Sequence, residues 1–451
     1  MTSKLPFLTP LVIFSLIFVN FKATAQESSV SSEAADSLNN KIENVQSEIS
    51  VLKRLKISGY IQAQWQLADT AGAVTPYSGG AFPIATDNRF GVRRGRIKFA
   101  YENELSNFVL QLDATEKGVS LKDAYIAVKD PWAQFVTLTA GVFNRPFGYE
   151  ITYSSSARET PERARIFQNL FPQERDLGAM ITLQPKKGTK YDWLKLDAGL
   201  FTGNGINSEF DTKKDFIGHL YFAKANKSET FKYGGGISYY NGGVFQGTKF
   251  VYTPGEVIDV TQPGLVDSTA SNKNSFAKRQ YLGFDAQFSV QSPIGFTTIR
   301  AEYITGQQPA GKNTSISTTS LAAGKSVLDF DTYIRKVSGG YIYFIQNIGQ
   351  TKNQLVLKYD WLDPNTKVSG ADIVAKSAAG KNTGLGIADI KFTTLGIGWN
   401  YRFNSQVKFT AYYEIVKNEE TGLSPVGLNR TLDTSKDLKD NVLTLRVQYK
   451  F

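Results

Sequence analysis

The chain has 451 residues and a formal net charge of +10, with 41% hydrophobic and 13% aromatic residues. It contains no cysteine and one histidine, His219, so disulfide frameworks, thiolate metal sites and zinc- or histidine-based catalysis have few or no residues to use. The basic balance favours anionic partners, but no nucleic-acid-binding motif is present, and we expect no nucleic acid among them.

The N-terminus has the pattern of a secretory signal peptide. Lys4 precedes the apolar run 11–21, and the small residues Ala23 and Ala25 stand before Gln26. This pattern predicts that residues 1–25 are removed by cleavage after Ala25. An uncleaved anchor is the alternative, but the run is too short for a membrane-spanning helix and no longer apolar run follows, so a membrane role requires strands.

Two short segments follow the leader. Residues 26–37 are rich in Ser, Glu and Ala and are predicted to be flexible. Residues 38–56 are predicted to form a short periplasmic helix with the a/d stripe of a coiled coil. The stripe consists of Leu38, Ile42, Val45, Ile49 and Leu52. Because a helix this short is marginal alone, we expect it either to associate with other copies or to pack on its own chain.

From residue 57 onward the hydrophobic pattern has a period of two, as in strands with one apolar and one polar face. We predict sixteen strands, at 57–67, 89–101, 105–115, 120–129, 134–143, 176–184, 192–202, 215–223, 231–240, 279–290, 295–305, 335–345, 353–362, 390–402, 405–417 and 439–451. Uncharged glutamines at the polar positions of the first strand indicate a wet lumen rather than a dry core.

The connections alternate between long and short, with one exception at 116–119. The long ones are 68–88, 144–175, 203–214, 241–278, 306–334, 363–389 and 418–438. Short turns on one side and long loops on the other are typical of transmembrane β-barrels. About sixteen strands would leave room for an aqueous channel, whereas about eight would not.

The last strand alternates apolar and polar residues and ends on Phe451. An ordinary edge strand is the alternative, but a terminal aromatic suits the headgroup level of a lipid-facing strand, and it resembles the C-terminal signal that the barrel-assembly machinery reads. We therefore predict an all-β protein, a transmembrane antiparallel β-barrel of about 16 strands over 57–451, preceded by a short helix. Its expected location is the outer membrane of a Gram-negative bacterium, in contact with lipid.

Cationic side chains are predicted on the lumen face. Arg94, Arg96 and Lys98 share one face of their strand, with no acid on that face before Glu102, and such a row attracts anions. Further lumen cations are expected at Arg300, Lys358 and Arg402. The alternative is a wall braced by mutually neutralising pairs, and we expect it for Arg300, which has Glu302 two residues away.

The long connection 144–175 is the candidate constriction loop. It is rich in arginine and contains no lysine. If it folds into the lumen, Arg158, Arg163 and Arg165 are the candidates for an eyelet, because guanidinium groups bind oxyanions bidentately. Its glutamates support the alternative of a salt-bridged loop held against the wall.

Several motifs resemble the phosphate-selective porin O and P family. They are Arg93-Arg94-Gly95-Arg96, Lys122-Asp123-Ala124-Tyr125, residues 141–150 (GVFNRPFGYE), Arg175-Asp176-Leu177-Gly178 and residues 359–365 (YDWLDPN). The resemblance implies a homotrimer of sixteen-stranded barrels that passes anions, with a short coiled segment in the periplasm. The loop lacks the lysine cluster of the family's phosphate site, so the resemblance implies anion preference more than phosphate specificity.

Together these features predict a porin for passive diffusion of small hydrophilic solutes, biased towards anions, phosphate among them. It needs no cofactor or metal. A specific channel for acidic sugars or oligosaccharides and a non-conducting barrel that tethers the envelope are the alternatives. An enzyme is not expected, because His219 has no nucleophile motif near it and no Gly-x-Ser-x-Gly occurs.

Overall fold

The computed structural model describes residues 32–74, 80–255, 264–317, 331–376, 380, 383–425 and 432–451. The predicted signal peptide lies outside these residues. The chain divides into two units, Met1–Lys53 and Arg54–Phe451. No helix within the described ranges has the length and apolar character that a membrane span requires.

The described part of the first unit is helical. Helix α1 spans Ser32–Arg54, a stretch without proline or glycine. It begins inside the segment predicted to be flexible, and β1 starts at Leu55, within the predicted helix. The boundaries 26–37 and 38–56 are therefore corrected to this extent. The apolar stripe residues Leu38, Ile42, Val45 and Ile49 are all exposed.

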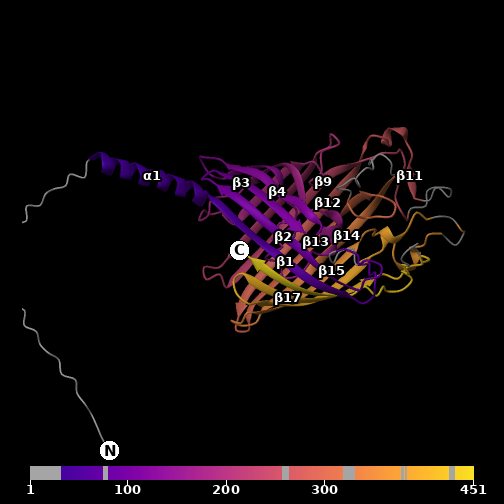
Figure 1. Ribbon diagram of the computed structural model, residues 1–451. Coiled ribbons are helices and arrows are strands. Elements are labelled where there is room, and N and C mark those ends of the chain that lie inside the picture. Colours follow the sequence, from indigo (N-terminus) through magenta and orange to yellow (C-terminus); the bar gives the residue numbers. More distant parts are fainter. Residues whose placement is uncertain are drawn as a thin grey trace, which may run out of the picture. The chain divides into compact units, whose positions relative to one another are not determined.

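The second unit is a closed antiparallel barrel of sixteen long strands, as predicted (Figure 1). The first eight are β1 Leu55–Ala68, β2 Asn88–Glu102, β3 Ser106–Thr115, β4 Gly118–Lys129, β5 Val136–Asn144, β6 Arg175–Leu183, β7 Leu194–Phe201 and β8 Asp215–Ala225. The others are β9 Phe231–Phe245, β12 Phe276–Ser292, β13 Gly295–Ala310, β14 Thr332–Asn347, β15 Asn353–Asp363, β16 Phe392–Arg402, β17 Val407–Asn418 and β18 Val442–Lys450.

Each strand pairs with its neighbour in the chain, and β18 pairs with β1 to close the sheet, from Tyr60↔Lys450 to Ala68↔Val442. β9 and β13 run on to Phe245 and Ala310, beyond their predicted ends. Two short strands, β10 Val251–Tyr252 and β11 Leu265–Asp267, were not predicted. They lie in the connection between β9 and β12, where β10 pairs with β14. Short helices occur in three connections: α2 Arg165–Leu170, η1 Ala270–Asn272, η3 Gly370–Asp372 and η4 Ile387–Asp389.

We call the end of the barrel where β1 begins and β18 ends the turn end, and the opposite end the loop end. Residues 103–105, 293–294 and 403–406 are turns at the turn end, whereas the loop end carries 145–174 and 419–441. The hairpin at 116–117 is the short exception at the loop end, as predicted.

Side-chain burial follows the predicted alternation, with polar residues inside. On β18, Arg446 is 6% exposed, whereas Leu445 and Val447 are 43% and 40% exposed. The apolar side chains thus form the outer surface, which suits lipid, and the polar side chains face the lumen.

We predict that Gly59→Ala weakens barrel closure. The N–H of Gly59 donates to the carbonyl of Phe451 at 3.1 Å, and the N–H of Phe451 returns a bond at 3.0 Å. A Cβ at Gly59 would lie 2.5 Å from the Arg96 carbonyl and 2.6 Å from the Phe451 ring. Such overpacking costs about 1–3 kcal/mol, which unfolding in detergent would measure.

Gly91→Ala on the neighbouring strand β2 is the control, because its Cβ would approach only the flexible Glu116 side chain, at 3.3 Å. Equal unfolding midpoints for the two variants would contradict the prediction.

Candidate functional site in the barrel lumen

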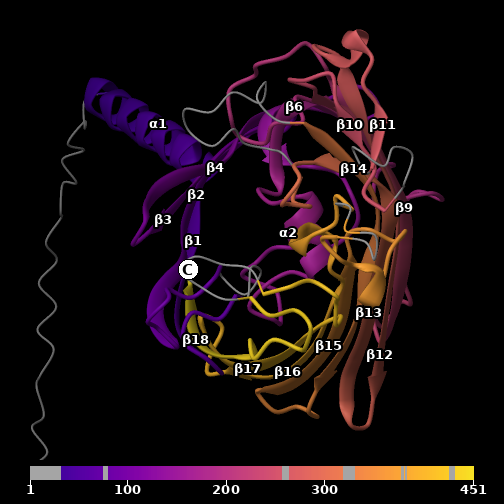
Figure 2. The same cartoon turned by 90° about the vertical axis from the view of Figure 1, so that its right-hand side faces the viewer.

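One long connection lies inside the barrel. Residues 145–174, called the lumen loop below, join β5 to β6, and α2, which forms part of it, is seen within the ring of strands in Figure 2. Phe147, Glu150 and Ile166 of the loop are each 0% exposed. A polar connection of this length is buried only where its charged and backbone groups find partners.

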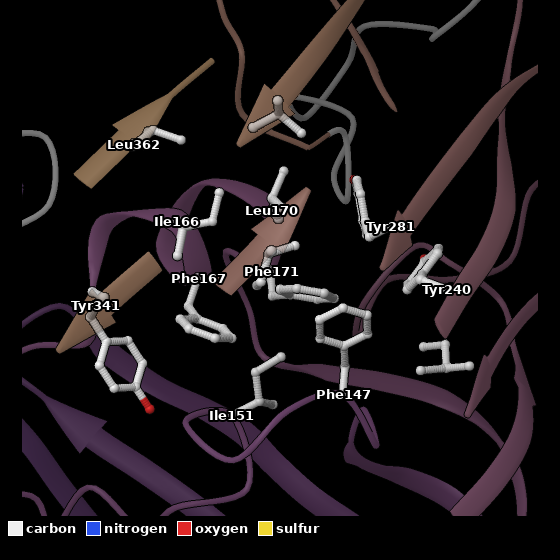
Figure 3. Packing of buried hydrophobic residues seen from close by; sticks show 14 of the residues in the cluster. Phe147, Ile151, Ile166, Phe167, Leu170, Phe171, Tyr240, Tyr281, Tyr341 and Leu362 are labelled. Atoms are coloured by element: carbon white, nitrogen blue, oxygen red, sulfur yellow. The ribbon is translucent and has the colours of Figure 1, made fainter. Parts of the chain in front are cut away.

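Aromatic packing holds one side of the lumen loop against the wall (Figure 3). The ring of Phe171 lies 5.0 Å from that of Phe147, 5.8 Å from Tyr281 on β12 and 6.0 Å from Tyr240 on β9. Phe167 lies 6.0 Å from Tyr341 on β14. These edge-on and tilted pairs form a dry core on one side of the lumen.

Glu302 on β13 fixes the same side of the loop through its backbone. Its carboxylate accepts hydrogen bonds from the N–H groups of Tyr149 at 3.0 Å and Glu150 at 2.5 Å, and from the Tyr341 hydroxyl at 2.6 Å. Arg300, predicted to pair with Glu302, instead pairs with Glu159 at 3.3 Å.

The loop also reaches the opposite wall. Loop carbonyls accept hydrogen bonds there: Pro161 from Arg446 at 2.9 Å, Glu159 from Asn400 at 2.9 Å, Arg158 from Lys408 at 2.8 Å, Ser155 from Gln62 at 3.1 Å and Ser156 from Gln448 at 3.0 Å. These donors lie on β1 and β16–β18, so the loop spans the lumen and narrows it.

Two β-bulges alter the predicted placement of lumen cations. Between β1 and β2 the register passes from Gln62↔Arg94 to Ala63↔Val92 and leaves Arg93 without an opposite residue. Between β3 and β4 it passes from Gln111↔Asp123 to Leu112↔Leu121 and leaves out Lys122. An extra residue re-aims the side chains around it.

Strict alternation along the strands assigns neither residue to the lumen. Arg93 and Arg94 contact the same loop carboxylate, and Lys122 reaches Asp113 at 4.0 Å. Two adjacent charged residues are the feature of the sequence that indicates each bulge. In a regular strand one of the two side chains would face lipid, which for Arg or Lys destabilises the barrel by about 2–4 kcal/mol.

Three arginines converge on Glu162. We call this cluster the three-arginine site. Arg93 places Nε 2.7 Å from one carboxylate oxygen and Nη2 2.9 Å from the other. Arg94 contributes Nη2 at 2.9 Å and Arg446 contributes Nη2 at 3.2 Å. Burial favours the neutral acid, but these three positive charges hold the pKa of Glu162 well below its usual range.

Two cavities adjoin this cluster. The one towards the loop end has a volume of about 400 Å³ and is lined by Gln64, Arg89 and Arg93 among others. The one towards the turn end has about 270 Å³ and is lined by five cationic side chains and one carboxylate, Asp123. The cationic residues are Arg96, Lys98, Arg163, Arg175 and Lys450.

The predicted lumen cations therefore fall into two groups. Arg94, Arg96, Lys98 and Arg163 come together at the three-arginine site and the turn-end cavity. No acid of β2 itself precedes Glu102 on this face, but Glu162 of the loop pairs with Arg94 and Asp113 of β3 pairs with Arg96.

The other predicted cations are spread out. Arg158 and Arg165 are only 2% and 3% exposed. Arg158 lies beside Glu150, and Arg165 donates a hydrogen bond to Thr394. They therefore brace the loop and do not form an open eyelet with Arg163. Lys358 pairs with Asp360 at 2.8 Å. Arg402 is exposed at the end of β16.

A closed 16-stranded barrel with one loop folded across a charged lumen defines the protein as an outer-membrane channel of the porin class. The sequence model of the phosphate-selective porin O and P family matches residues 84–241. This stretch contains four of the five motifs noted above, and the match confirms the family resemblance. The protein accordingly resides in the outer membrane of a Gram-negative bacterium.

Solved structures share the fold. An anion-selective porin from Comamonas acidovorans superposes with a TM-score of 0.51 at 10% identity, over 88% of this chain and 99% of that chain. OprB from Pseudomonas putida, in its high-pH structure, gives a TM-score of 0.56 at 9% identity, over 90% and 96%. At such identities the likeness concerns the fold alone. No curated protein matches the sequence at a significant level.

We predict that Phe171→Ala loosens the lumen loop. The variant removes the ring at the centre of the aromatic cluster. Truncating a buried phenylalanine to alanine lowers the stability of the packing by about 3–5 kcal/mol. We expect the barrel to stay folded while trypsin cuts at loop arginines at least tenfold faster, as mass spectrometry would show. Phe284→Ala is the control, because Phe284 is 43% exposed on the outer face of β12; equal cleavage of both variants would contradict the prediction.

A second prediction concerns pH. Burial raises the pKa of Asp440, in the connection before β18, from 3.8 to about 7; Arg165 opposes the shift, and the carboxylates of Asp437 and Asp69 reinforce it. Neither carboxylate oxygen has a hydrogen-bond partner among the described residues. The folded state therefore retains a proton that the unfolded chain releases at lower pH.

Stability should consequently rise as the pH falls from about 7 to about 4, with a slope of up to about 1.4 kcal/mol per pH unit. The gain is lost as the pH rises through 7, where a buried carboxylate becomes charged. Asp440→Asn should flatten this dependence in urea titrations, whereas Asp87→Asn, at an exposed loop position, should not. An unchanged slope in Asp440→Asn would refute the assignment.

Proposed function

We propose that this outer-membrane channel passes small hydrophilic solutes by diffusion and favours anions. The observation that carries the proposal is the lining of the turn-end cavity, where five cationic side chains outnumber the three carboxylates that line it or pair with them, Asp123, Asp113 and Glu174. Cations that line a narrow pore lower the energy of an anion and raise that of a cation. No covalent chemistry or cofactor is part of this mechanism.

The cationic side chains are ordered along the direction of transport. Arg89 and Arg93 line the cavity towards the loop end, Arg94 occupies the middle of β2, and Arg96 and Lys98 line the cavity towards the turn end. A small anion, phosphate among them, would move from one cationic side chain to the next, past carboxylates such as Glu116 in the loop-end cavity.

The assembly is also a proposal. The exposed apolar stripe of α1 has the spacing of a coiled-coil seam, which supports association of three copies through this helix. The outward apolar faces of the strands support contact with lipid, and Phe451 at the end of β18 supports recognition by the barrel-assembly machinery. The signal peptide remains a sequence prediction.

The test is the zero-current potential of the purified protein in a planar bilayer across a KCl gradient. We expect a chloride-selective potential, and a several-fold lower chloride-to-potassium permeability ratio in the double variant Arg96→Gln/Lys98→Gln. Lys227→Gln/Lys352→Gln is the matched control, because it also removes two charges, from exposed turns at the same end of the barrel.

Cation selectivity of the native channel would refute the proposed anion preference without affecting the assignment of the barrel fold. Absence of conductance would instead support a structural barrel that tethers the envelope.

A further inference from the structure

The three-arginine site binds the carboxylate of Glu162 as a receptor binds a ligand. We propose that this site is a carboxylate-binding station of the channel, occupied at rest by Glu162, and that the carboxylate group of a permeating organic acid exchanges with it. The inference rests on the proposed function and specifies the chemical class of solute.

The geometry is that of oxyanion recognition. Arg93 presents two nitrogens to the two oxygens of Glu162, at 2.7 and 2.9 Å, which is the bidentate fork that guanidinium groups offer to planar carboxylates. Arg94 donates from Nη2 to Oε2 at 2.9 Å and from Nη1 to Oε1 at 3.4 Å, and Arg446 donates from Nη2 to Oε1 at 3.2 Å. Chloride is a single spherical ion and has no pair of oxygens for this fork.

The charge of the cluster favours a further anion. Three arginines share one carboxylate, which leaves a charge of +2 (3 − 1). Other buried arginines have a carboxylate of their own, such as Arg145 with Asp176 at 2.9 Å and Arg335 with Asp389 at 2.8 Å. A buried excess of positive charge is costly, and an entering carboxylate reduces it.

Neutral acceptors hold two of the arginines in place independently of Glu162. Arg446 donates from Nε to Gln64 at 3.0 Å and from Nη1 to the Pro161 carbonyl at 2.9 Å. Arg94 donates to Gln62 at 3.1 Å, and Gln62 is itself bonded to Gln448 at 2.7 Å. The site thus stays organised when the Glu162 side chain swings away, which lowers the cost of exchange.

The site borders the loop-end cavity through Arg93 and lies next to the turn-end cavity. The Arg93 side chain is 34% exposed and lines the cavity towards the loop end together with Gln64. Tyr60 and Arg96 line the cavity towards the turn end. Gln62, bonded to Arg94, stands between Tyr60 and Gln64 on the lumen face of β1, so the station lies between the two cavities.

Glu162→Gln tests the exchange, with succinate as the probe. The variant keeps the shape of the side chain and removes the internal competitor, so we expect succinate to block the chloride current at least tenfold more tightly than in the native channel. Glu159→Gln is the matched control: it makes the same charge change in the same loop, but Glu159 serves a single arginine, Arg300. There we expect less than a twofold change.

A second variant addresses the possibility that Glu162→Gln does not fold. Arg93→Gln leaves Glu162 with two arginines and should weaken succinate block of the native channel several-fold. Equal effects of Glu162→Gln and Glu159→Gln, or an unchanged block in Arg93→Gln, would overturn the station. Tighter block by inorganic phosphate than by succinate in Glu162→Gln would overturn the carboxylate assignment. A cation-selective native channel is a separate result, which refutes the proposed function itself.

Discussion

Closure of the sheet is the constraint on which the rest of the molecule depends. The hydrocarbon core of a membrane offers no partner for an unpaired backbone N–H or C=O, so a sheet that spans it can have no free edge. The pairing of β18 with β1 meets this requirement, and the bonds between Gly59 and Phe451 extend it to the last residue. Once the sheet is closed, alternate side chains must face lipid or the lumen.

Closure therefore places charge inside, and the lumen loop compensates much of it. Wall residues such as Arg94, Arg300 and Arg446 would be isolated cations in a confined space, a costly arrangement without partners. The loop brings Glu162 and Glu159 to them, while its aromatic side chains pack against β9 and β12. The compensation is incomplete at Glu162, where three arginines share one carboxylate.

The two bulges add to the positive charge inside the barrel. Each inserts one residue into a strand, and in each the residue is a cation, Arg93 or Lys122. A bulge in the wall thus increases the density of charge along the pore without a longer strand or another loop. The same device brings two adjacent arginines of β2 to a single carboxylate, which regular alternation does not allow.

The sequence by itself determined the barrel. A period of two, the order of long and short connections and the alternation in the last strand depend on local chain geometry and on the contrast between lipid and water, both of which are visible in a single chain. The number of long strands and the inward direction of Arg94 and Arg96 followed from this pattern, while strand ends moved by a few residues and the helix began earlier than its apolar stripe suggested.

Only the tertiary structure decided which charges meet. Glu162 lies 68 residues from Arg94 and 284 from Arg446 in the chain, and no periodicity relates such positions. Pairing inside the lumen depends on where the loop crosses and on which residue a bulge omits from the register. The path of the loop depends on packing between distant segments, such as Phe171 against Tyr240 and Tyr281. This is why Arg158 and Arg165 brace the loop while Arg93 meets Glu162.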